Sequence, residues 1–348
     1  MTEAEAPRPT RWWSLALRIV VSLTLMWWLV HNFQGGWRKL GDIQPLSLAP
    51  AALIFTISTI LGALQWGLLL RHAGLDLSLG RLARIYWIGL FFNNFLPSNV
   101  GGDLVKVADV SLSTGELSRA VAGTILDRVV GLSALAALGV IAALLSRGFG
   151  HLDLPSVVLI GVCLLLLLTG GLLLSNRLGE RITLLVGRLR FARIHERMQN
   201  LMSEFARYRR SPLFLLGIFS LSLLVQFFRV LTHVLVAQAL AIPLSWPLVL
   251  GLYVLIPVLG IAIVLPVSFN GLGLRELIAT RLLPGIGIAA PEAFALQITT
   301  YLVQVAVSGV GGVFFVLRFL RGGKRRRAQD EKRGVSRVEG PPEVPGRE

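Results

Sequence analysis

The sequence predicts an all-α polytopic membrane protein, with about six full spans and two oppositely directed re-entrant helical hairpins arranged as an inverted repeat. Its 348 residues are 54% hydrophobic and only 15% charged, whereas soluble domains carry about 25% charged residues. The mean hydropathy is +0.70, and this length accommodates roughly six to nine spans of about 20 residues. In addition, two apolar helices, one in each half of the chain, are interrupted in the same way.

Both interruptions run from an apolar helix through Leu-Pro and small polar residues to two glycines, and then restart as an amphipathic helix with a basic residue. Broken helices in corresponding positions of two halves indicate a transporter's binding site. Non-helical backbone at membrane depth needs protein or a water-filled cavity beside it. We therefore expect the two tips to meet near the midplane and line a cavity. The tip residues are Asn94, Pro97, Gly101, Gly102, Pro266, Asn270, Gly271 and Gly273.

The N-terminal half alternates clear spans with one interrupted segment. Residues 1–11 form a short polar lead on the cytoplasmic side. Residues 12–31 form the first span, with tryptophans at both ends where amphipathic rings suit the membrane interface. This span lacks a small-residue cleavage site, so we do not interpret it as a signal peptide. Residues 47–70 and 119–146 form two further spans, and the segment 85–118 between them is too interrupted for a clean crossing.

The C-terminal half follows a similar order. Residues 154–175 form a leucine-rich span without charges, and residues 176–212 form a basic amphipathic segment with nine arginines against three glutamates. Residues 213–240 and 291–320 form the last clear spans. The tail, 321–348, is basic at its start and then rich in proline, glycine and glutamate, so we expect it to be disordered.

The distribution of charge predicts the orientation. The net charge is +15, and the bases lie mostly in loops and in the tail, which indicates contact with anionic lipids rather than with nucleic acid. Cytoplasmic loops carry an excess of lysine and arginine, so we expect the 71–84 loop, the basic segment and both termini to be cytoplasmic. The crossings are then consistent only if 85–118 dips into the membrane and returns to the cytoplasmic side.

By the same reasoning, 248–284 begins and ends on the outer side. The transmembrane domain, 12–320, then contains two inverted halves, about 47–146 and 213–320, each built of a span, a hairpin and a span. The alternative, which keeps the tail on the same side but removes the symmetry, is two ordinary crossings at 248–266 and 269–288.

Several function classes lack the residues that they need. Cys163 is the only cysteine, so no internal disulfide can form. The five histidines have no metal-ligand spacing, and no phosphate-binding loop of the GxxxxGK[ST] type occurs. We therefore expect no metal, no other cofactor and no ATP hydrolysis by the chain itself.

Lys106 and Asp103 follow the first pair of glycines. Free N–H groups at a helix start attract anions, and Lys106, which we place in the first turn, suits a lipid phosphate. Asp103 is also a good helix cap, a role that would use one donor and repel the anion. In the second interruption we expect Asn270 to cap the helix. Arg275 and Glu276 should need separate partners, because adjacent residues do not face each other on a helix.

Asp127 and Arg128 lie within an apolar stretch, where charges are costly and usually face a cavity or a partner. One interpretation is an ion pair with another segment, between Arg128 and either Glu276 or Asp103. The other makes Arg128 a phosphate clamp, because its guanidinium offers a bidentate fork.

Polar stripes follow one face of two later spans, Gln226, Arg229 and His233 in one, and Gln297, Tyr301, Gln304 and Ser308 in the other. Such stripes often hold helices together, but Arg229 near the centre of its span is harder to explain in that way. Four basic residues fit a cavity for an acidic head group, with three acidic residues beside them. These candidates for substrate binding are Lys106, Arg128, Arg229 and Arg275, together with Asp103, Asp127 and Glu276.

The combined motifs resemble the membrane region of lysylphosphatidylglycerol synthases, found also as stand-alone flippase-like integral membrane proteins of bacteria and archaea. The resemblance covers roughly residues 12–320 and rests on four stretches: 94–97, 101–103, 127–131 and 270–276. It implies a polytopic bundle with re-entrant helices that moves polar lipids between leaflets, here in the cytoplasmic (inner) membrane of a bacterium. The chain departs mildly from the family at Ser98, Asp127 and Asn270, where many members have Gly, Glu and Gly.

The synthases also carry a large soluble domain that transfers lysine from charged tRNA. Residues 321–348 are too few for that fold, so we expect neither aminoacyl transfer nor an inherited lysyl-lipid substrate. The leading hypothesis is a lipid translocase for anionic or phosphate-linked lipids, driven by a gradient, a coupled ion or downstream consumption. The alternatives are an intramembrane transferase or hydrolase with Asp103 or Asp127 as base, and an accessory subunit beside a partner enzyme of a glycolipid or phospholipid pathway.

Overall fold

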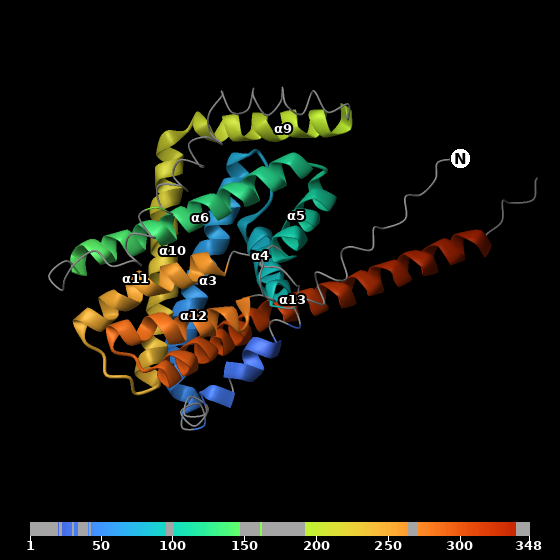
Figure 1. Cartoon of the computed structure of the whole chain (residues 1–348). Coiled ribbons are helices and arrows are strands. Elements are labelled where there is room, and N and C mark those ends of the chain that lie inside the picture. Colours follow the sequence, from blue (N-terminus) through green and yellow to red (C-terminus); the bar gives the residue numbers. More distant parts are fainter. Residues whose placement is uncertain are drawn as a thin grey trace, which may run out of the picture.

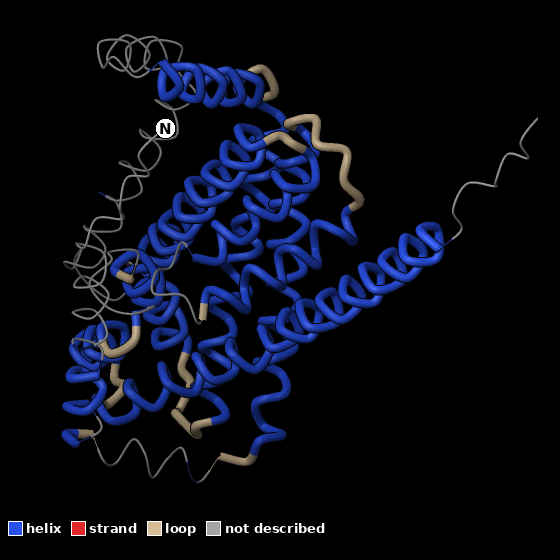
Figure 2. Tube along the Cα trace, turned by 90° about the vertical axis from the view of Figure 1, so that its right-hand side faces the viewer, coloured by secondary structure: helices blue, strands red, loops and turns tan. Residues whose placement is uncertain are grey.

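The computed structural model describes residues 43–94, 101–146, 192–263 and 271–338, a few residues between 20 and 41, and residue 161; side chains are not described for 192–198 and 321–338. Every element in this part of the chain is helical (Figures 1 and 2). In chain order the elements are η1 (Pro45–Leu48), α3 (Ala49–His72), α4 (Leu79–Asn93), α5 (Gly101–Thr114), α6 (Leu117–Leu145), α9 (Ala192–Arg209), α10 (Pro212–Ala239), α11 (Trp246–Ala262), α12 (Leu274–Leu282), η4 (Leu283–Ile286) and α13 (Ala290–Val338).

The described residues contain four helical segments long and apolar enough to cross a membrane: Pro45–His72, Leu117–Leu145, Pro212–Ala239 and Ala290–Leu320. In the most apolar stretch of each, only 22–33% of the residues are buried in protein. Apolar residues that the protein does not cover fit a lipid environment. The four segments match four of the spans that the sequence predicts, and the chain is a multi-pass membrane protein. The other two predicted spans lie wholly or largely outside the described residues.

As predicted, each of the two interrupted segments contains two separate helices rather than one continuous helix. The segment 85–118 contains α5 and most of α4, and these two helices pack against each other. The segment 248–284 likewise contains most of α11 and the whole of α12, which are also in contact. Of the eight tip residues, Pro97, Pro266 and Asn270 lie outside the described residues.

Helix contacts are the same in the two halves of the chain. The first half is α3, α4, α5 and α6, and the second is α10, α11, α12 and α13. α4 packs on α13 and α11 packs on α6, so the two-helix segment of each half lies against the last span of the other half. The first spans, α3 and α10, pack on each other. Exchanging the two halves therefore reproduces the same set of neighbours.

Glycines allow α4 to lie unusually close to two other helices. A Cβ on Gly102 of α5 would lie 2.0 Å from the backbone oxygen of Gly89, and a Cβ on Gly311 of α13 would lie 1.9 Å from the backbone oxygen of Trp87. Real Cβ atoms do not come so near to a backbone oxygen. Both glycines are therefore required by the close packing of α4, α5 and α13.

α9 and the C-terminal part of α13 lie outside the four candidate membrane spans. α9 comes from the basic segment and lies across one end of the bundle, where it contacts α6 and α10 (Figure 1). α13 continues to Val338, past Arg321, where we expect the disordered tail to begin, and projects from the bundle (Figures 1 and 2). Lysine, arginine, alanine and glutamate are good helix formers, so this helix extends further than the sequence indicates.

Candidate functional site

A pocket of about 360 Å³ lies where α3 to α6 meet α10 to α13. Small-molecule sites have volumes of roughly 300–1,000 Å³, so this pocket suits a head group rather than a whole lipid. Its wall contains six of the seven charged residues predicted to bind substrate, namely Asp103, Lys106, Asp127, Arg128, Arg229 and Arg275. The seventh, Glu276, is fully buried and forms an ion pair with Arg275. These residues come from four helices, α5, α6, α10 and α12, that are far apart in the sequence and are thus brought to one site.

Asp103 holds two basic side chains together at one end of this pocket. Its Oδ1 lies 2.7 Å from Lys106 Nζ, and its Oδ2 accepts a hydrogen bond from Arg128 Nε at 2.5 Å. Asp103 and Lys106 are both buried. Asp103 is therefore a partner of Arg128, as one of the two suggested ion pairs requires. Because both of its oxygens are engaged by cations, Asp103 is poorly suited to act as a general base.

The expected capping role of Asp103 is wrong. α5 begins at Gly101, so Asp103 lies inside its first turn and Lys106 lies in the second turn rather than in the first. Asn93 of α4 accepts a hydrogen bond from the Gly102 N–H through Oδ1 at 2.7 Å. The amide of Asn93 thus satisfies a helix-start donor, which leaves the Asp103 carboxylate for the two cations.

Aromatic rings surround the Lys106 ammonium. Its Nζ lies 4.7 Å from the ring centroid of Tyr86 and 5.1 Å from that of Trp66. Such cation–π contacts contribute about 2 kcal/mol when the cation is desolvated. A Cβ on Gly89 would lie 2.6 Å from Lys106 Cγ, so glycine at this position leaves room for the lysine. Tyr86 and Trp66 were not among the site residues predicted from the sequence.

Asp127 of α6 forms a hydrogen bond with Gln65 of α3. Its Oδ1 accepts a hydrogen bond from Gln65 Nε2 at 2.8 Å, and it interacts electrostatically with Lys106 and Arg229. Gln65 was not among the site residues predicted from the sequence, although a glutamine inside an apolar span is a signal of a polar contact between helices. Its Oε1 is buried and has no hydrogen-bond partner in the part of the chain that the structure describes.

The second charged cluster lies at the start of α12. Arg275 Nη2 and Nε lie 2.6 and 3.0 Å from Glu276 Oε1, and the guanidinium lies 4.6 Å from the ring centroid of Tyr301. Glu276 Oε2 also accepts a hydrogen bond from the Gly273 N–H at 2.8 Å. The expectation that these adjacent residues need separate partners is wrong, because in the first helical turn the glutamate folds back over the helix start.

The cap of α12 is also different from the one expected. The helix begins at Leu274, and its N-cap residue is Gly273, with φ of 81°. Gly271 also has a positive φ, 74°. Glycine adopts this conformation without steric cost. Asn270 therefore precedes the N-cap residue by three positions in the sequence, and both glycines supply the positive φ that the backbone adopts before the helix.

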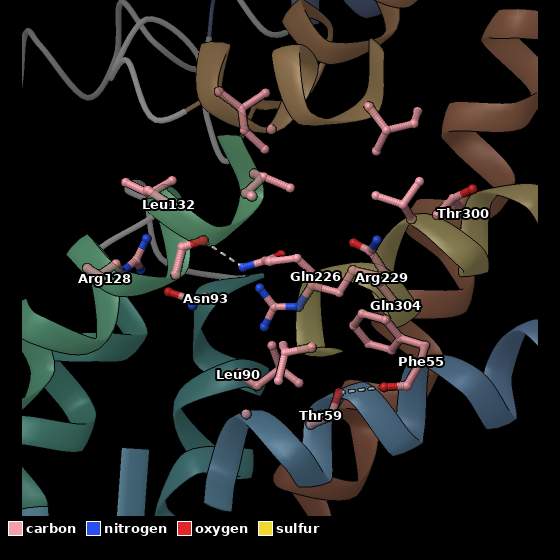
Figure 3. Close-up of a pocket in the computed structure, with 18 of the residues that line it drawn as sticks. Phe55, Thr59, Leu90, Asn93, Arg128, Leu132, Gln226, Arg229, Thr300 and Gln304 are labelled. Atoms are coloured by element: carbon pink, nitrogen blue, oxygen red, sulfur yellow. Dashed lines mark hydrogen bonds between the residues drawn. The ribbon is translucent and has the colours of Figure 1, made fainter. Parts of the chain in front are cut away.

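Arg229 lies in the middle of the pocket wall. Figure 3 shows it extending from α10 into the space between Gln226 and Asn93, with Arg128 on the far side. Gln226 Nε2 donates a hydrogen bond to the Gly131 carbonyl of α6 at 3.0 Å, so this glutamine links two helices. Among the described residues, no side chain forms an ion pair or a hydrogen bond with the Arg229 guanidinium. Four basic and two acidic side chains line the pocket.

The polar stripe on α13 divides between two roles. Gln297, Tyr301 and Gln304 line the pocket. Ser308 instead accepts a hydrogen bond from Asn94 Nδ2 at 2.6 Å, so it holds the end of α4 against α13. In the described part of the chain, no three His, Cys, Asp or Glu side chains lie close enough together to hold a metal ion.

Comparisons with known proteins also indicate a membrane protein. The sequence profile described as the lysylphosphatidylglycerol synthase TM region matches residues 15–312. A UPF0104 membrane protein of Pyrococcus horikoshii is 29% identical over 119 residues, which are 33% of this chain and 35% of that protein. The chain thus matches about a third of the length of this curated relative. No solved structure matches the chain.

Proposed function

The chain belongs to the lysylphosphatidylglycerol synthase TM region family of membrane proteins in lipid-related processes, and we propose that it is a lipid translocase. It would move a phosphate-bearing lipid between the leaflets of the cytoplasmic membrane of a bacterium, with both of its termini in the cytoplasm. The head group would cross through the charged pocket, and the acyl chains would stay in the bilayer.

The observation that carries this proposal is the Arg229 guanidinium, which lines the pocket and forms no ion pair or side-chain hydrogen bond with any described residue, although Asp127 interacts with it electrostatically. A cation within an apolar span is costly unless an anion or water compensates it. Arg275 is already paired with Glu276, and Lys106 with Asp103. Arg229 is thus the base best placed to receive a phosphate oxygen, which guanidinium groups bind in bidentate geometry.

The basic groups around Arg229 support the same ligand. Arg128 donates to Asp103 from Nε, and its side chain is 36% exposed. Its side chain lies on the pocket wall at the side opposite Arg229 (Figure 3). Two guanidinium groups from different helices can hold a phosphate between them more firmly than either can alone. Lys106, which is paired with Asp103, adds a further positive charge to the pocket wall.

The repeated contacts of the two halves suggest how the pocket would become accessible first from one side of the membrane and then from the other. Transporters built from internal repeats move one repeat against the other around a fixed central site. Here α4 lies against α13 and α11 lies against α6, so a sliding movement of α4 on α13 would be accompanied by an equivalent movement of α11 on α6. We interpret these segments as the two re-entrant hairpins that the sequence predicts.

The test is lipid movement in reconstituted vesicles. Purified protein is placed in vesicles that contain a phosphatidylglycerol with a fluorescent acyl chain, and dithionite quenching measures how fast the inner-leaflet lipid becomes accessible. We expect movement well above that of protein-free vesicles and a loss of at least about tenfold, or 1.4 kcal/mol of barrier, in Arg229→Gln.

The matched control is Arg281→Gln. Arg281 is exposed on α12 and is not part of the pocket wall, so the same chemical change there should leave lipid movement unchanged. Equal rates of lipid movement for wild type and Arg229→Gln would show that Arg229 does not bind the phosphate. Rates no higher than those of empty vesicles would exclude translocation of this lipid.

A further inference from the structure

Three buried polar side chains line the pocket and leave one atom each without a hydrogen-bond partner in the described part of the chain. These atoms are Gln65 Oε1, Ser222 Oγ and Gln297 Nε2. The three residues are 4%, 0% and 1% exposed. A buried polar group without a partner costs about 1–3 kcal/mol, so a ligand that supplied partners to all three around this cavity would recover that free energy.

Ser222 lacks the hydrogen bond that other hydroxyl groups on its helix form. Hydroxyl groups in a helix commonly donate to the carbonyl oxygen four residues earlier. On the same helix, Ser220 donates to the Leu216 carbonyl at 3.0 Å and Thr232 to the Phe228 carbonyl at 2.9 Å. Ser222 has no hydrogen bond of this kind, although it is fully buried. Its hydroxyl group is therefore available to a ligand in the pocket.

The three atoms need different partners. Gln65 Oε1 can only accept a hydrogen bond, Gln297 Nε2 can only donate one, and the Ser222 hydroxyl can do either. A phosphate oxygen satisfies donors alone, and an ammonium group satisfies acceptors alone. A hydroxyl group both donates and accepts. Several hydroxyl groups on one ligand are thus the simplest match to all three positions.

Further amides lie around the same space. Gln226 and Gln304 line the pocket beside Arg229, as Figure 3 shows, and Asn93 approaches from α4. Gln304 has no hydrogen bond to any described residue. Uncharged amides thus lie beside Arg229, whereas Lys106 and Asp103 form the charged end of the pocket. A phosphate bound at Arg229 would place the rest of its head group among the amides.

We infer that the head group carried by this protein is a phosphate-linked sugar or polyol, recognised through its hydroxyl groups by Gln65, Ser222 and Gln297. This inference rests on the proposed translocase function and specifies its substrate class. Sites that hydrogen-bond a hydroxyl group reject an analogue that lacks it, because the buried polar groups are then left unpaired. The protein should therefore discriminate strongly between lipids of equal charge that differ only in hydroxyl groups.

The experiment compares two anionic lipids with the same fluorescent acyl chains, phosphatidylinositol and phosphatidylethanol, in the vesicle assay described above. Both have a phosphodiester with one negative charge, but only the first has hydroxyl groups on its head group. We expect phosphatidylinositol to move at least tenfold faster. If both move equally fast and faster than in empty vesicles, the inference is overturned and the translocase proposal stands. If neither moves faster than in empty vesicles, the translocase proposal fails and the inference fails with it.

Variants separate recognition from folding. Gln297→Leu removes an amide that has no protein partner at Nε2, so the thermal unfolding temperature should stay the same or rise, while the preference for phosphatidylinositol falls at least threefold. Ser222→Ala should act in the same direction, and the control Ser220→Ala, whose hydroxyl is bound to Leu216, should keep the full preference. A lower unfolding temperature with an unchanged preference in both pocket variants would show that these side chains serve structure and would overturn the inference.

Discussion

Replacing Asp103 with asparagine tests the charged end of the pocket most directly. Asp103 is the carboxylate that holds both Lys106 and Arg128, at 2.7 and 2.5 Å. The asparagine keeps the size of the side chain and one acceptor oxygen but removes the negative charge. Lys106 is then left buried without its ion-pair partner.

The magnitude follows from the burial of that lysine. Breaking a buried ion pair by removing one partner costs about 3–5 kcal/mol. Asp127 also interacts electrostatically with Lys106, and the side chain of Arg128 is 36% exposed, so part of the loss is compensated. We therefore expect about 3 kcal/mol, the lower end of this range. For a domain of this size, 1 kcal/mol corresponds to roughly 2 °C, which predicts a fall of about 6 °C in unfolding temperature.

Thermal unfolding in detergent, followed by tryptophan fluorescence, provides the measurement. The control is Asp109→Asn on the same helix, where the partner, Arg318, is 61% exposed and is therefore not left buried in protein when the acid is lost. An exposed ion pair contributes about 1 kcal/mol or less, so the control should shift the unfolding temperature by no more than about 2 °C.

A double variant completes the test. Lys106→Met in the Asp103→Asn background removes the stranded charge, so it should recover most of the lost stability, and the coupling between the two changes should exceed 1 kcal/mol. The reasoning is refuted if Asp103→Asn unfolds at the wild-type temperature. It is also refuted if the double variant is as unstable as Asp103→Asn or less stable.

Three further predictions concern packing and backbone. Gly102→Ala places a Cβ 2.0 Å from the Gly89 backbone oxygen; we expect a loss of about 3 kcal/mol and a reduced monodisperse fraction in size-exclusion chromatography, and a wild-type profile would contradict this close packing. Gly273→Ala forces alanine to φ of 81° and should cost about 1 kcal/mol, seen as a small fall in unfolding temperature. Tyr208→Phe removes a hydrogen bond to the Leu69 carbonyl at 3.0 Å and should cost about 1 kcal/mol. Burial raises the pKa of the Tyr208 hydroxyl, so unfolded tyrosine ionises first and this contribution is lost above about pH 10; a pH scan of unfolding should show a weaker alkaline decline in Tyr208→Phe.

The spans and the polar faces could be predicted because both depend on residues close together in the sequence. Long apolar stretches indicate membrane helices whatever lies next to them. The spacing of Gln226 and Arg229, and of Gln297 and Gln304, places each pair on one face of its helix. All four residues line the pocket. Helical periodicity, however, does not say which opposing residue each one meets.

The partners in the charged clusters illustrate what such reasoning misses. Asp103 is a good cap by residue type, but Asn93 takes that role because α4 and α5 approach closely at Gly89 and Gly102. Arg275 and Glu276 pair although they are adjacent, because the left-handed Gly273 brings its N–H to the glutamate. Both outcomes depend on the path of the backbone at a helix start.

From the amino-acid sequence alone, one can derive the membrane class, the approximate spans and the two interrupted segments, because hydropathy and helix-breaking residues act locally along the chain. The tertiary structure was needed to bring Gln65 to Asp127 and Arg229 to the space facing Arg128. It also showed which polar atoms the protein leaves unsatisfied. These features depend on the register between helices that are distant in the sequence, and that register is set by how their side chains and glycines pack.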